Sequence, residues 1–290
     1  MKTVQFTMLL TIPHRNNHHS HHYNGAKKPG CAPKRITMTK PIDWNKTIAA
    51  TWRSRQQQLK AVDDVDLMQL NRLLGIDRQK QAFCKNVENF IQSKPTNHTL
   101  LWGARGTGKS SLVKAALNEY QHQGLRVIEI PKDDLRWLVD ITDDIRQLDY
   151  RFIIFCDDLS FEEGETSFKE LKSTLQGSIE KPPENVLVVA TSNRRHLIPE
   201  QMKDNVQSSL VNGEIHHSDT IEEKMSLSDR FGLSLSFYPL NQNDYFAIVD
   251  MLFADINIEN KGELHVLADQ FARERGSRSG RIAQQFFNHQ

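Results

Sequence analysis

The sequence TLLWGARGTGKSSLVKAAL, at positions 99–117, contains three adjacent patterns. An apolar run at 99–102 leads into a glycine-rich segment at 103–110, and a helical pattern of apolar residues begins at 112. The glycine-rich segment matches GxxxxGK[ST], a motif that indicates a phosphate-binding loop when it joins a strand to a helix. We therefore interpret residues 103–110 as a P-loop rather than a chance match.

The chemistry of this loop lies mostly in its backbone. Gly103, Gly106 and Gly108 can adopt dihedral angles that turn successive amide N–H groups toward anionic oxygens. The helix that begins near Lys109 adds the positive end of its dipole. Lys109 is expected to contact the β- and γ-phosphates of ATP, and the hydroxyl of Ser110 is expected to bind Mg²⁺. The other residues of the loop expected to bind the nucleotide are Arg105, Thr107 and Ser111.

The composition is that of an ordinary globular chain of 290 residues with a net charge of +1. The first forty residues hold seven basic and no acidic side chains, so the remaining 250 carry 30 basic and 36 acidic ones, a balance of −6. A globally basic surface that coats nucleic acid is therefore not indicated.

The cysteines and the hydropathy bear on the compartment. Cys31, Cys84 and Cys156 are widely spaced and form no CxxC pair, which argues against a disulfide framework or a zinc site. No apolar stretch approaches the length that spans a bilayer. We expect a cytoplasmic protein with no membrane partner.

The N-terminal part differs from the rest in composition. Residues 1–40 are basic and rich in histidine, and we expect a disordered leader; a signal peptide and a metal site are the weaker alternatives. Met38 is an alternative start of translation, which would make the leader an error of gene annotation. Residues 41–72 are predicted to form a helical segment, because apolar positions recur at helical spacing from Trp44 onward.

Apolar runs downstream of the P-loop alternate with helical patterns, which predicts a parallel, doubly wound α/β sheet with ligands at the carboxyl ends of its strands. The predicted strands after the first are 125–130, 151–156, 186–191 and 233–237. Helices are predicted at 79–90 and 133–148, and a helical appendage follows residue 241, with helices at 242–253, 262–274 and 279–287.

Acidic and amide side chains follow two of these strands. Asp157 and Asp158 come directly after the run at 151–156, which has the form of a Walker B motif. Asp157 is expected to hold Mg²⁺, and Asp158 is expected to polarise the attacking water. Asn193 follows the strand at 186–191, and its amide can orient that water. The competing interpretation of both groups is a polar, solvated turn.

Two arginines are candidates for stabilising a transferring phosphate. Arg230 precedes the last predicted strand, and Arg281 stands at the start of the last helix. An arginine aimed at the transferring phosphate neutralises charge that grows in the transition state. A surface ion pair is the common alternative for an isolated arginine.

Taken together, these residues resemble the AAA+ ATPases. The resemblance implies a P-loop NTPase with a five-stranded αβα domain over 73–240 and a C-terminal helical lid over 241–290. It further implies that Leu74 touches adenine, that Asn193 is the sensor 1 residue, and that Arg281 is the sensor 2 arginine of the lid. Arg230 falls where the finger from a neighbouring subunit lies, which implies a homo-oligomer with Arg230 acting in trans.

A narrower resemblance, from about residue 52 to 287, is to an uncharacterised bacterial family of predicted AAA+ ATPases. It is carried by the stretches LLWGARGTGKSSLVKA, FIIFCDDLSFE, ATSNRRHLIPE, EEKMSLSDRFGL and GSRSGR. The leader has no counterpart in it.

The sequence departs from the AAA+ pattern in two places. The second Walker B acid is Asp158 where most members have Glu, so hydrolysis is expected to be slow, with Glu162 or Glu163 as candidate helpers. The segment 131–138 lacks the aromatic-hydrophobic-glycine triplet of protein-threading members, and Trp137 there is expected to pack in the core.

The function predicted from the sequence is an ATPase that does conformational work on an unidentified protein or nucleic-acid client. The alternative is a slow-hydrolysing loader or adaptor switch in which ATP occupancy is the signal. The insertion at 194–230, with Arg194 and Arg195, is predicted to be a solvated segment, with contact to nucleic acid as the alternative.

Overall fold

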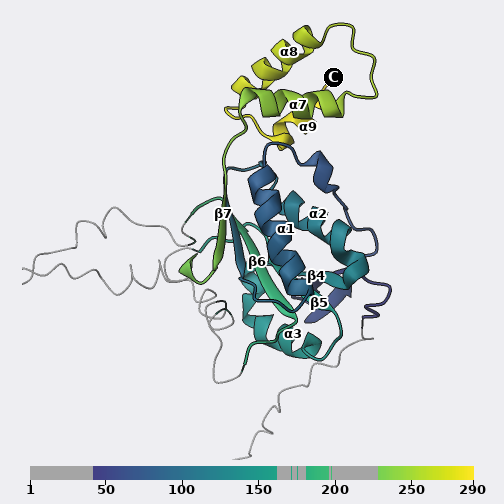
Figure 1. Ribbon diagram of the computed structural model, residues 1–290, viewed down its shortest axis with the longest axis vertical. Helices are drawn as coiled ribbons and strands as arrows, with labels where there is room; N and C mark the ends of the chain where they lie inside the picture. Colours follow the sequence, from purple (N-terminus) through teal and green to yellow (C-terminus); the bar gives the residue numbers. More distant parts are fainter. Residues whose placement is uncertain (1–41, 162–170, 172–174, 176–180, 196, 198–227) are drawn as a thin grey trace, which may run out of the picture. The chain divides into compact units, whose positions relative to one another are not determined.

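The computed structural model describes residues 42–161, 171, 175, 181–195, 197 and 228–290 (Figure 1). These residues form a sheet of seven strands in the order β2-β1-β4-β5-β6-β3-β7. All neighbouring strands are parallel except β1 and β2. The strands are β1 (Ala49–Arg53), β2 (Gln58–Ala61), β3 (Thr99–Gly103), β4 (Leu125–Glu129), β5 (Arg151–Cys156), β6 (Val186–Ser192) and β7 (Leu233–Phe237).

The central strands are buried on both faces, as their nearly continuous apolar runs predict. Alternate residues enter two separate cores: Phe152 and Ile154 pack on one side of the sheet, and Ile153 and Phe155 on the other. Helices α1 (Asp77–Ile91) and α2 (Lys109–Tyr120) cover the second side. The P-loop strand β3 lies between β6 and β7, so the loop leaves the sheet beside the carboxyl ends of both neighbours.

The segment after β4 is only partly the helix that its pattern predicts. Residues Lys132–Trp137 form a 3-10 helix, η3, and an α-helix, α3, covers Leu138–Ile145. Trp137 packs against the first core with its ring 5.7 Å from that of Trp52, in agreement with the expectation of core packing. Shorter 3-10 turns occur at η1 (Leu70–Arg72) and η2 (Gln121–Gln123).

Three helices form a third core near the C-terminus, where Tyr245, Val249 and Phe286 are buried. They are α7 (Gln242–Leu252), α8 (Lys261–Glu274) and α9 (Gly280–Phe287). Each begins at a residue whose side chain accepts a backbone N–H of the first turn, namely Asn241, Asn260 and Ser279. Such N-caps satisfy donors that a helix start leaves unpaired and explain where these helices begin.

The N-terminal region differs from two expectations. Residues 41–72 were expected to form a helical segment, and the sheet was expected to have five strands. Residues 49–53 and 58–61 form a β-hairpin that extends the sheet to seven strands, with β1 running parallel to β4. Ala49, Ala50 and the glutamines at 56–58 favour a helix locally, but pairing with β4, far away in sequence, overrides that preference. The predicted domain boundaries at residues 72 and 240 stay predictions.

Several expectations fall on residues outside those described. They concern the leader with its histidines and Met38, the helper acids Glu162 and Glu163, and most of the insertion at 194–230. Among the described residues, none of the helices combines the length and the hydropathy that a membrane span requires.

His98 makes the stability of this sheet sensitive to acid. Its Nδ1 accepts a hydrogen bond from the Val188 N–H, at 3.1 Å, and burial lowers the pKa of His98 to about 4. In the unfolded chain the same group titrates near its ordinary value of about 6.5. Between these values the unfolded state binds more protons, so stability falls as pH falls.

We predict that the free energy of unfolding drops by on the order of 2 kcal/mol between pH 6.5 and 4 through this group. Urea titrations of the wild type and of His98→Gln across this range measure the effect. The matched control is His122→Gln, at an exposed histidine of η2. A wild type and a His98→Gln variant with parallel pH profiles would refute the assignment.

Candidate functional site

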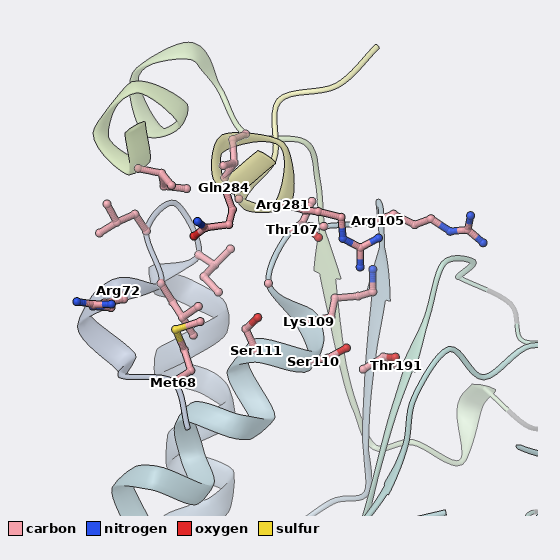
Figure 2. A pocket seen from close by; sticks show the side chains of 18 of the residues that line it. Met68, Arg72, Arg105, Thr107, Lys109, Ser110, Ser111, Thr191, Arg281 and Gln284 are labelled. Atoms are coloured by element: carbon pink, nitrogen blue, oxygen red, sulfur yellow. The ribbon is translucent and has the colours of Figure 1, made fainter. Parts of the chain in front are cut away.

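A cavity of about 630 Å³ lies where the carboxyl edge of the sheet meets the C-terminal helices (Figure 2). Most of the residues predicted from the sequence line it. They are Leu74, Arg105, Gly106, Thr107, Gly108, Lys109, Ser110, Ser111, Asp157, Asp158, Asn193 and Arg281. Gly103 and Arg230 do not line the cavity.

The P-loop backbone has the conformation that its glycines predict. Gly106 and Gly108 have φ of +75° and +98°, in the left-handed region that disfavours side chains. Gly108 is also the N-cap of α2, so the first amides of that helix open onto the cavity. Gly103 has a different role: a Cβ there would lie 1.9 Å from the Phe237 carbonyl oxygen, so this glycine lets β7 approach β3.

The Lys109 side chain is buried among loop carbonyls. Its Nζ donates to the Gly103 and Ala104 oxygens at 2.9 and 2.7 Å, and Asn193 Oδ1 lies 3.5 Å away. Burial lowers the pKa of Lys109, while the charges of Asp157 and Asp158 act in the opposite direction. A partly desolvated cation of this kind is strongly attracted to an anion that enters the cavity.

A short chain of hydrogen bonds joins α2, β5 and β6. Ser110 Oγ donates to Asp157 Oδ1 at 2.6 Å, and Thr191 Oγ1 donates to the same oxygen at 2.5 Å. Thr191 Oγ1 in turn accepts the Asp158 N–H at 2.9 Å. Thr191 was missed in the sequence because a threonine within a strand is ordinary; its place in β6 directly opposite β5 gives it this role.

Asp158 has an unusual backbone and a close partner. Its φ is +51°, and its Oδ1 accepts a hydrogen bond from Asn193 Nδ2 at 2.5 Å. Aspartate tolerates the left-handed region better than most residues with a side chain. The left-handed backbone therefore gives a physical reason for Asp at this position where Glu was the expected acid.

The last C-terminal helix, α9, contacts the P-loop through a main-chain hydrogen bond. The Arg281 N–H donates to the Gly106 oxygen at 3.3 Å, and a Cβ on Gly106 would lie 2.8 Å from Arg281 Cβ and Ser279 Oγ. The Arg281 side chain extends from α9 toward Lys109 (Figure 2). The turn before α9 is held by Arg278, whose Nε donates to the buried Asp269 at 2.8 Å.

The far end of the cavity is mostly apolar. Met68, Leu73, Leu74, Ile76, Leu240, Ile248, Met251 and Leu252 line it, with Arg72 and Gln284 as polar members. Figure 2 shows Met68 and Arg72 on one side of this end and Gln284 on α9. Of these residues the sequence indicated Leu74, within the segment 73–77 that the resemblance places at the adenine. The residues outside that segment come from parts of the chain that meet only after folding, so no local signal identifies them.

Arg230 lies outside the cavity that the P-loop lines, three residues before the start of β7. It precedes β7, whose first residue, Leu233, donates its N–H to the His98 oxygen at the start of β3.

The fold and the site define the class of protein. A mostly parallel sheet in which β6 separates the P-loop strand β3 from the Walker B strand β5, with C-terminal helices at the cavity, is the AAA+ arrangement expected from the sequence. The chain belongs to the family described as protein of unknown function DUF815, whose model matches residues 45–290.

Known structures share this fold. The RuvB Holliday junction branch migration motor of Thermotoga maritima is similar, with a TM-score of 0.51 and 16% identity over 76% of this chain and 63% of that chain. A mutant of that protein gives a TM-score of 0.50 at 17% identity, over 76% of this chain and 64% of its own. At this identity the likeness shows the fold alone.

A shorter match is to the replication factor C large subunit of Staphylothermus marinus. It is 41% identical over 66 residues, 22% of this chain and 15% of that protein. The chain thus spans under two thirds of the RuvB structure and a small part of this relative.

The contact between Gly106 and α9 can be tested with matched glycines. Gly106→Ala introduces a Cβ against Ser279 and Arg281, whereas Gly124→Ala meets nothing within 4 Å although its φ is also positive, at +89°. Both variants pay a backbone cost of about 1 kcal/mol. We predict that only Gly106→Ala speeds amide hydrogen exchange in α9, measured by mass spectrometry. Equal exchange in the two variants would contradict the contact.

Proposed function

We propose that this protein binds and hydrolyses Mg²⁺-ATP and couples the reaction to movement of its lid against a macromolecular client. One observation carries the proposal. The cavity has a polar end, where Lys109, Ser110, Asp157 and Asp158 converge, and an apolar end under α7. A nucleotide has the same division into a charged triphosphate and a flat base.

The residues present fit a magnesium ion. Ser110 Oγ, directly after the P-loop lysine, and Asp157 Oδ1, directly after β5, are hard oxygen ligands 2.6 Å apart. No cluster of three or more His, Cys, Asp or Glu side chains occurs in the described residues, so the protein would supply few ligands, as is usual for Mg²⁺ held with phosphates. When bound, Mg²⁺ neutralises charge on the β- and γ-phosphates.

The side chains around the polar end have distinct proposed roles. Lys109 holds the phosphates, and the amides of Gly106 to Ser110 surround them. Asp158 accepts the proton of the attacking water, and Asn193, which contacts both Lys109 and Asp158, positions that acceptor. Arg281 brings a positive charge from the lid, so lid position and phosphate charge are coupled.

The apolar end is proposed to hold adenine. Leu74 packs partly against the lid core, so the base would lie between the N-terminal segment and α7. Binding there would bury apolar surface of both parts at once, which favours a closed lid.

Arg230 is proposed to act on the nucleotide of a neighbouring subunit. Its absence from the lining of its own cavity supports a role in trans, which requires a homo-oligomer. The client, a protein or a nucleic acid, and a cytoplasmic location remain part of the proposal.

A second candidate function is a slow ATP-controlled switch that loads or adapts a partner. The hydrogen bond from Asn193 to Asp158 favours it, because a carboxylate engaged in this way is a weaker acceptor for water, and Asp is also one methylene shorter than Glu. Misplacement of a catalytic group by about 1 Å can cost on the order of a hundredfold in rate.

Two variants test the assignment of the polar end. Asp158→Asn is predicted to bind ATP with wild-type affinity but to lower turnover at least about tenfold, because it removes the proton acceptor. Lys109→Ala is predicted to lose ATP binding. Calorimetry gives the affinity and phosphate release gives the rate. Wild-type turnover in Asp158→Asn would exclude that residue as the base.

The same measurements separate the motor from the switch. A motor hydrolyses ATP in multiple turnovers and is stimulated by its client. A switch binds ATP tightly and stays slow with every partner added.

The role of Arg230 is tested by mixing variants. Arg230→Ala is predicted to bind ATP but lose turnover, and adding it to Lys109→Ala should restore part of the rate, since one subunit then supplies the P-loop and the other the arginine. Arg78→Ala, at an exposed arginine of α1, is the control. If the wild type oligomerises and no mixture recovers activity, the role in trans is wrong.

A further inference from the structure

The β1–β2 hairpin stands at one side of the sheet and contributes no residue to the lining of the cavity. Thr51 of β1 lies opposite Glu129 of β4, and the two strands are parallel. The hairpin tip, which we define as Arg53–Gln57, therefore emerges at the carboxyl edge of the sheet, the edge that also carries Asp157. Two strand spacings, about 10 Å, separate β1 from β5.

The hairpin is basic in a chain that is otherwise acidic. The hairpin, residues 49–61, contains three basic side chains and no acidic one, whereas residues 41–290 together carry 30 basic and 36 acidic. All five residues of the hairpin tip are exposed, in the sequence Arg-Ser-Arg-Gln-Gln. Neither Arg53 nor Arg55 forms an ion pair with any residue that the structure describes. A local cation surface on an acidic body concentrates an anionic partner at one place.

The hairpin tip is held in position by the segment after β4. Ser54 Oγ donates to the buried Asp134 carboxylate at 2.5 Å, and the Trp52 and Trp137 rings pack 5.7 Å apart. Asp134 and Trp137 belong to η3, which also carries Lys132, the exposed Asp133 and the exposed Arg136. A held surface loses less conformational entropy on binding than a free loop does.

The chemistry of the hairpin tip selects among anionic partners. The large apolar side chains exposed in the described residues are Leu67, Val139, Tyr238, Ile256, Val266 and Leu267, and none belongs to the hairpin. Because the tip has no aromatic or aliphatic side chain, it offers no hydrophobic anchor for a protein partner and no aromatic ring on which a base can stack. Arginine, serine and glutamine are donors typical of contacts to phosphate oxygens.

We propose that the hairpin tip binds the phosphodiester backbone of a nucleic acid without reading its bases. Nucleic acid would then be the client of the proposed ATPase, and this identification of the client rests on the proposed ATPase function. Binding itself involves surface groups remote from the P-loop and does not require ATP, so it is measured separately.

Lys132 connects the tip to the ATP site. Its Nζ donates to the Ser160 oxygen at 3.0 Å, two residues after Asp158, while its own segment η3 contacts Ser54 through Asp134. A nucleic-acid backbone bound at the hairpin tip would therefore be connected, through η3 and Lys132, to the segment that carries Asp157 and Asp158.

The experiment uses the full-length protein without nucleotide and labelled 30-mers of duplex DNA, single-stranded DNA and single-stranded RNA. Fluorescence anisotropy between 50 and 200 mM salt gives affinity and its salt dependence. The variant Arg53→Gln with Arg55→Gln removes two charges, and the control Lys94→Gln with Lys261→Gln removes two exposed charges elsewhere. Thermal unfolding midpoints of the two double variants are measured to check that each remains folded.

We expect the wild type and the control to bind, and the tip variant to bind at least about tenfold more weakly, with a salt slope lower by roughly 1.5 because two phosphate contacts are lost. Affinity that is equal in the tip variant and the control overturns the proposal, as does wild-type protein that binds none of the three nucleic acids at 50 mM salt.

Polyglutamate with the same net charge as the nucleic acids tests whether the hairpin tip instead binds an acidic protein. Tighter, tip-dependent binding to polyglutamate than to the nucleic acids would also overturn the proposal. A tip that binds nucleic acid in a protein that fails to hydrolyse ATP would leave this inference standing and refute the proposed ATPase.

Discussion

The carboxylate of Asp157 is the point on which the polar end of the cavity depends. It accepts hydrogen bonds from Ser110 at the start of α2 and from Thr191 in β6, so one oxygen ties together three elements of the sheet domain. The same contacts fix the backbone on both sides, because Thr191 also accepts the N–H of Asp158. The neighbouring acid is thereby held in its left-handed conformation, in reach of Asn193.

The polar end of the cavity was largely predictable from the sequence, and the apolar end was not. Gly106 to Ser110 form a contiguous motif, and the acids and Asn193 follow strands whose carboxyl ends must meet in a parallel sheet. The apolar end depends on how the helices after residue 241 rest on the sheet domain, which no periodicity encodes. Met251 and Gln284 are ordinary lid residues until that arrangement is known.

The N-terminal hairpin shows a second limit of local patterns. Ala49, Ala50 and the glutamines at 56–58 favour a helix, and Trp52 fits either interpretation. What makes β1 a strand is its pairing with β4, more than seventy residues later in the chain. Arg230 illustrates the opposite case: its sequence position was evident, but only the folded chain shows that it does not line the cavity of its own P-loop.

The lid meets the P-loop through main-chain atoms, the Arg281 N–H and the Gly106 oxygen. The side chain at position 281 therefore has no part in that hydrogen bond, and the guanidinium and the docking of α9 are separable properties of one residue. Changes of charge at this position can alter how the lid responds to phosphate while its resting place is preserved. Gly106 has no such freedom, because Arg281 Cβ and Ser279 Oγ occupy the space that a Cβ on this residue would need.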